Sequence, residues 1–115
     1  MLAARLYEHA IAAVPDNHPA HLNLGTVLYL EGRPADAVAH FREVVRILPA
    51  WGVGHHNLGN ALLTTGPIDE AERFLAESVR LMPARVDYRV DYATALRRLG
   101  RKEEAAKQLE EALRL

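Results

Sequence analysis

The sequence lacks cysteine altogether, and it has no long hydrophobic run. Without cysteine there is no disulfide framework, no thiolate zinc site and no cysteine nucleophile. The longest apolar runs span only a handful of residues, well short of the roughly 20 that cross a bilayer. Glu8 and His9 interrupt the N-terminus where a signal peptide needs its apolar centre. We therefore expect no membrane insertion and predict a cytoplasmic location.

An excess of charge of either sign is also missing. Lys and Arg together number 14 against 15 for Asp and Glu, which gives a net charge of -1. A nucleic-acid binder needs a basic field that attracts phosphates, so we expect no nucleic-acid partner. Apolar residues make up 50% and charged residues 25% of the 115 residues, which is typical of one modest globular domain.

Patterns that carry catalysis or bind metals are absent too. Ser78 is the only serine, and no glycine pattern around it resembles a nucleophile elbow. The glycines follow neither phosphate-loop nor dinucleotide-binding spacing. Among the histidines, His55 and His56 are neighbours that point to different helix faces, which is poor geometry for one ion. The sequence therefore predicts a protein that is not an enzyme and needs no cofactor or metal.

Several residue types recur every 34 residues along the chain. The clearest series are an alanine, a proline and a glycine: Ala3, Ala37, Ala71 and Ala105; Pro15, Pro49 and Pro83; Gly32, Gly66 and Gly100. Self-similarity at one fixed period is the signature of a repeat architecture. We divide the single domain of residues 1–115 into a half unit at 1–17, full units at 18–51 and 52–85, and a near-complete unit at 86–115.

Each unit has the pattern of two helices. Apolar residues at helical spacing precede Gly32, which ends the first helix, and Pro34 occupies a helix start where its missing N–H costs nothing. The same pattern in the other units predicts helices near 3–13, 18–31, 35–47, 52–64, 68–81, 86–99 and 102–114. Gly25 and Gly59 are expected where the paired helices approach closely beside Ala37 and Ala71, because these residues have little or no side chain.

The series resembles the tetratricopeptide repeat (TPR), whose pattern is an aromatic residue, Leu-Gly, a tyrosine, Ala-x3-Phe and Pro. The match here runs through Leu24-Gly25, Leu28, Ala37, Phe41 and Pro49, and it continues in the next two units with Leu58-Gly59 and Tyr92-Ala93. Histidine or arginine replaces the aromatic residue, at His21, His55 and Arg89. The two Asn-Leu-Gly segments most resemble the repeats of O-GlcNAc transferase-like bacterial proteins. The resemblance implies an all-α, right-handed superhelical solenoid of antiparallel helix pairs.

The resemblance also implies that the first helix of each unit lines a concave groove that binds a protein or peptide. The groove residues it assigns are Asn23, Thr26, Tyr29, His56, Asn57, Asn60, Leu63, Val90, Asp91, Thr94 and Arg97. An asparagine side chain carries both a donor and an acceptor, so a row of them can hold the backbone of an extended peptide. We interpret the chain as a non-catalytic interaction scaffold on this basis.

Two other functions remain open, and the histidines need an interpretation. The chain is alternatively the targeting arm of a larger glycosyltransferase-like enzyme, or a module that self-associates through its N-terminal helix, where Leu2, Leu6 and Tyr7 lack a partner helix. His21 and His55 occupy equivalent repeat positions, so we interpret them as half-buried packing residues.

Overall fold

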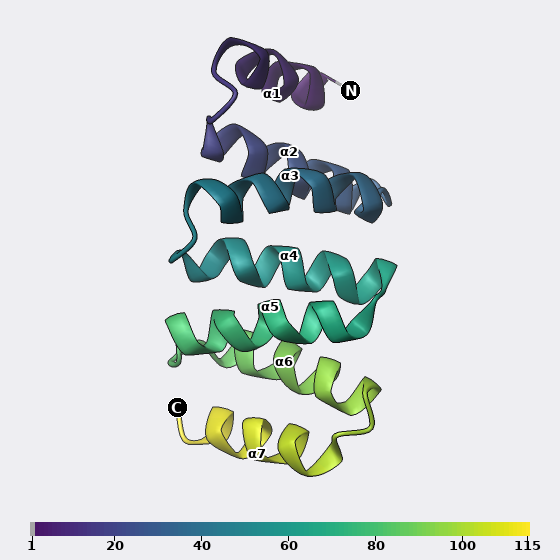
Figure 1. Ribbon diagram of the computed structural model, residues 1–115, viewed down its shortest axis with the longest axis vertical. Coiled ribbons are helices and arrows are strands. Elements are labelled where there is room, and N and C mark those ends of the chain that lie inside the picture. Colours follow the sequence, from purple (N-terminus) through teal and green to yellow (C-terminus); the bar gives the residue numbers. More distant parts are fainter. Residues whose placement is uncertain (1) are drawn as a thin grey trace.

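The computed structural model describes residues 2–115, and within this range the chain is entirely helical, with no strand. The helices follow one another along the long axis (Figure 1). They are α1 (Leu2–Ala13), α2 (His18–Leu30), α3 (Pro34–Ile47), α4 (Gly52–Thr65), α5 (Ile68–Leu81), α6 (Val86–Arg98) and α7 (Lys102–Leu113). Every predicted helix is present, and no boundary differs from its prediction by more than one residue.

The helix ends follow the glycine and proline signals of the sequence. Gly32, Gly66 and Gly100 adopt positive φ angles of 79°, 64° and 79°, a conformation that residues with a Cβ adopt only at a cost. Pro34 begins α3, and the Asn17 side chain caps α2 by accepting a hydrogen bond from the Ala20 backbone N–H at 3.1 Å. Local chemistry therefore fixes where the chain reverses direction.

The helices pair as α2 with α3, α4 with α5 and α6 with α7, and each pair also packs on the next. The result is an all-α, right-handed superhelical solenoid with extents of 46 × 24 × 19 Å. Its interior is formed by leucines and alanines at repeat-equivalent positions, among them Leu24, Leu58, Ala37 and Ala71, all buried. Since each unit buries its apolar face only against its neighbours, the pairs depend on one another for stability.

The helix pairs are close at Gly25 and Gly59, but the residue that faces each glycine differs from the prediction. A Cβ on Gly25 would lie 2.6 Å from Cε1 of Phe41, and one on Gly59 would lie 2.6 Å from Cγ of Leu75. The missing Cβ therefore makes room for a large side chain of the facing helix. From the sequence we place Ala37 and Ala71 at this contact, whereas the atoms nearest to a Cβ at each glycine belong to Phe41 and Leu75.

The N-terminal helix departs from the repeat register. Ala4 is buried, whereas Ala3, the residue equivalent to the fully buried Ala37, is exposed. In the full units that position faces the first helix of its own pair, and the described residues contain no such helix beside α1. For the same reason Leu2 and Leu6 are 76% and 61% exposed. Tyr7 is half-buried and packs against the core.

Candidate functional site

One side chain near the start of each first helix binds the preceding loop. His21, His55 and Arg89 each contact the backbone carbonyl of the proline six residues earlier, at 2.8, 2.8 and 2.9 Å for Pro15, Pro49 and Pro83. A carbonyl oxygen only accepts, so Nε2 of each histidine carries the proton. Both histidines are buried, more deeply than the half-buried packing role that we predicted.

A second residue, on the paired helix, completes this contact differently in each unit. Nδ1 of His21 lies 3.1 Å from Nδ1 of His40, and the Arg89 guanidinium donates to Gln108 Oε1 at 2.9 Å. In the middle unit Phe74 lies beside His55 at a ring distance of 5.9 Å, and Nδ1 of His55 is buried without a partner in the described residues. Burial, and secondarily the neighbouring His21, lower the pKa of His40. These pairs join the two helices of each unit.

Side chains of the three first helices meet across the units. The Tyr29 hydroxyl lies 3.1 Å from Thr64 Oγ1, joining α2 to α4, and the Arg98 guanidinium donates to the Leu63 carbonyl at 2.8 Å, joining α6 to α4. We call the surface formed by α2, α4 and α6 the first-helix face. All predicted groove residues lie on these three helices.

The junction of α4 and α6 on this face is closed by a polar cluster. His56 Nε2 lies 2.6 Å and Asn60 Nδ2 lies 3.2 Å from Asp91 Oδ2, so both donate to the same carboxylate oxygen. Because both nitrogens bond the same oxygen, Asn60 Nδ2 also lies 3.1 Å from His56 Nε2. His56 also stacks on Tyr88, with ring centroids 4.0 Å apart. Asn60 and Asp91 are therefore already bonded to each other.

Asp87 is also engaged within the chain. The Arg85 guanidinium donates to both of its carboxylate oxygens, at 3.0 and 2.9 Å. Hydrogen bonds from Arg85 hold the pKa of Asp87 below its ordinary value. Arg85 also lies over the Tyr88 ring, 4.4 Å from its centroid. Asp87 is therefore paired with Arg85 at the start of α6.

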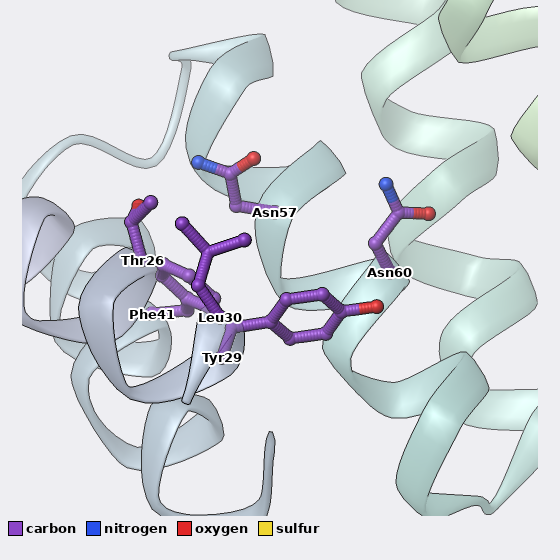
Figure 2. Close-up of a pocket in the computed structure, with 6 residues that line it drawn as sticks. All are labelled: Thr26, Tyr29, Leu30, Phe41, Asn57 and Asn60. Atoms are coloured by element: carbon purple, nitrogen blue, oxygen red, sulfur yellow. The ribbon is translucent and has the colours of Figure 1, made fainter. Parts of the chain in front are cut away.

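The junction of α2 and α4, in contrast, is open. A pocket with a volume of about 130 Å³ lies there (Figure 2), lined by Thr26, Tyr29, Leu30, Phe41, Asn57 and Asn60. The Thr26 hydroxyl donates to the Leu22 carbonyl at 2.9 Å, and the Tyr29 hydroxyl is bonded to Thr64. Within residues 2–115 the half-buried Asn57 side chain makes no hydrogen bond, and it lines the pocket.

The predicted site residues thus divide into three groups. Four of them line the pocket, His56 and Asp91 form the polar cluster together with Asn60 of the pocket lining, and the rest are spread along the face. Among the latter, Asn23, Val90 and Arg97 are exposed, and Thr94 donates to the Val90 carbonyl. Leu63 packs against the core. Our sequence interpretation missed Leu30 and Phe41, although Leu30 follows Thr26 by four residues and so shares its helix face.

Over residues 2–115, no group of three or more His, Asp or Glu side chains is placed to hold a metal ion. In that same range, none of the helices combines the length and the hydropathy that crossing a bilayer requires.

Comparison with known proteins identifies relatives by sequence and by structure. Tetratricopeptide repeat profiles match residues 1–50 and 53–115. A search of curated protein sequences gives no significant match. Among solved structures, a crystal structure of MamA superposes with a TM-score of 0.92 at 21% identity, covering 96% of this chain and 64% of that one.

Two other MamA structures are similar to the same extent. MamA from Desulfovibrio magneticus RS-1 gives a TM-score of 0.91 at 19% identity, with 97% of this chain and 63% of that chain covered. A MamA structure designated AMB-1 gives 0.87 at 27% identity, with 97% and 61% covered. The chain thus spans less than two thirds of these MamA chains. These neighbours do not support our finer resemblance to O-GlcNAc transferase-like proteins. The profiles together cover nearly the whole sequence, and the chain belongs to the tetratricopeptide repeat family.

Proposed function

We propose that the first-helix face binds an extended segment of a protein partner and that the chain acts as a non-catalytic scaffold. The observation that carries this proposal is the Asn57 amide, which makes no hydrogen bond within residues 2–115 and lines an open pocket, on the same face as the exposed Asn23. An amide has a donor and an acceptor, which match the C=O and N–H of a peptide backbone. Backbone contacts of this kind hold a segment without demanding its sequence.

The polar cluster limits where such a segment binds. The family resemblance assigns Asn60 and Asp91 to the same groove as Asn23 and Asn57. Because Asn60 and Asp91 are bonded to each other, they contribute less to a ligand than the free amides do. We therefore assign the main backbone contacts to Asn23 and Asn57, in the first two units, and give Val90, Thr94 and Arg97 a flanking role.

Selection from a displayed library of random linear peptides tests this function. We expect peptides that bind the intact chain and lose about 5- to 30-fold in affinity on Asn57→Ala, because one or two buried hydrogen bonds are lost. Lys107→Ala, on the exposed surface of α7, is the control and should leave affinity unchanged. Selected peptides that bind Asn57→Ala as tightly as the unmodified chain would contradict the assignment.

Self-association is a second candidate, favoured by the exposed leucines of α1. Leu2 and Leu6 present an apolar surface at one end of the solenoid, and Leu109 and Leu113 of α7 present another. Inside the chain, however, units join through a second helix against a first helix, such as α3 on α4. Both end helices are second helices, so an end-to-end contact would form a junction of a new kind. Sedimentation of the chain and of Leu6→Glu tests it: the variant should be more monomeric if α1 is the interface.

A further inference from the structure

The two junctions of the first-helix face have the same repeat positions but different chemistry. Leu22 in α2 corresponds to His56 in α4, and Asn57 in α4 corresponds to Asp91 in α6, each 34 residues later. His56 can donate to Asp91, and this bond closes the second junction. Leu22 has no polar group to offer Asn57, so the first junction keeps both its pocket and a free amide.

The lining of the pocket selects the chemistry of a ligand. None of its six side chains is charged. The hydroxyls of Thr26 and Tyr29 are bonded within the chain, so they present mainly carbon to the pocket. Leu30, which is 79% exposed, adds an apolar wall at the mouth, and the Phe41 ring lies beneath it (Figure 2). A charged side chain would lose hydration here and find no opposite charge in the lining.

The volume of the pocket further limits which ligand side chains fit in it. Its volume of about 130 Å³ is close to that of an engineered apolar cavity, about 150 Å³, that binds benzene. Such a volume holds one leucine- or phenylalanine-sized side chain. Asn57 lies at the edge of the pocket, where its amide can reach the backbone that carries that side chain (Figure 2).

We propose that this pocket anchors one leucine- or phenylalanine-sized side chain of a bound segment, while Asn57 bonds the adjoining peptide group. The inference rests on the proposed function, which it deepens by naming the class of segment: extended, with a neutral apolar anchor. The second junction, with His56 bonded to Asp91, provides no equivalent anchor. Recognition is thus concentrated between the first and second full units.

A small probe tests the anchor without a known partner. N-acetyl-leucinamide carries the side chain and two peptide groups, and N-acetyl-glycinamide carries the peptide groups alone. In amide NMR spectra of the nitrogen-labelled chain, we expect the leucine probe to shift signals of Thr26, Leu30 and the Asn57 side chain with a millimolar dissociation constant. The glycine probe should bind about tenfold more weakly, because it buries no side chain.

Matched variants test whether the leucine probe binds in this pocket. Thr26→Phe fills the pocket and should abolish the shifts. Thr65→Phe is the same change at an exposed position of α4 outside the pocket lining, where it also removes a hydroxyl bond to a backbone carbonyl, and it should leave the shifts intact. Leu30→Ala, at an exposed position, should weaken binding of the leucine probe without affecting the fold. If Thr26→Phe does not fold, Leu30→Ala still tests whether the probe binds in this pocket.

Each outcome decides for or against the anchor. Equal shifts with both probes, shifts centred elsewhere, or binding that survives both Thr26→Phe and Leu30→Ala would overturn it. Peptides selected from the library separate the two proposals. If they bind the first-helix face equally well with and without Thr26→Phe, the anchor is wrong and the proposed function stands. If no peptide binds but the leucine probe does, the pocket accepts a leucine side chain, but the proposed function fails and the anchoring of a bound segment fails with it.

Discussion

The close contact between α4 and α5 at Gly59 predicts that Gly59→Ala destabilises the chain. The same substitution should be stabilising once Leu75 is replaced by alanine. A Cβ at this position would lie 2.6 Å from Cγ and 2.7 Å from Cδ2 of Leu75, which is fully buried. Ordinary carbon contacts are about 3.5–4.0 Å. Overpacking of this kind costs about 1–3 kcal/mol, against about 1 kcal/mol gained in helix propensity. We expect Gly59→Ala to lower the free energy of unfolding by about 1 kcal/mol.

The same substitution should stabilise a chain that carries Leu75→Ala. Leu75→Ala alone costs about 2–5 kcal/mol through the cavity that it leaves. A Cβ at residue 59 then meets no clash and occupies part of that cavity. Urea unfolding of the four proteins, followed by far-ultraviolet circular dichroism, gives a coupling energy that we expect to exceed about 1 kcal/mol. An equal effect of Gly59→Ala in both backgrounds would refute the close approach of the two helices.

Two further predictions concern the other contacts between helices. The lowered pKa of His40 means that the folded state disfavours its charged form, so this contribution to stability is lost as pH falls below the ordinary value of 6.5. His40→Phe copies the arrangement of His55 with Phe74 and should remove this part of the pH dependence of stability. The measurement is urea unfolding at about pH 5 to 8. An unchanged slope of the free energy of unfolding against pH would contradict the assignment of this pH dependence to His40. Leu58→Ala, at a fully buried position, should cost about 2–5 kcal/mol and lower the melting temperature, and a variant that melts with the unmodified chain would show that Leu58 is not in the core.

The sequence predicted the fold closely because its signals are local and repeated. Gly32, Gly66 and Gly100 follow helix ends because glycine readily adopts a positive φ angle. The same boundary signal recurs every 34 residues. The period also identified His21 and His55 as equivalent residues. Their hydrogen bonds to proline carbonyls were not predicted, because those bonds depend on the path of the preceding loop.

The candidate site was predicted less completely. The resemblance to the repeat family placed the polar residues on α2, α4 and α6, but it does not say which of them meet across units. The bond between His56 and Asp91 joins residues in successive first helices, and it depends on their separation and rotamers. The same limit applies to Phe41, which reaches the pocket from a second helix only because Gly25 has no Cβ.

The central claim, that the first-helix face is the working surface, is tested most directly by a crystal structure of the chain with a library-selected peptide. We predict an extended peptide along α2 and α4, with its backbone within hydrogen-bonding distance of the Asn57 amide and one apolar side chain in the pocket beside Thr26. A peptide bound to the opposite surface, on α3, α5 and α7, with Asn57 still exposed to solvent, would contradict the account.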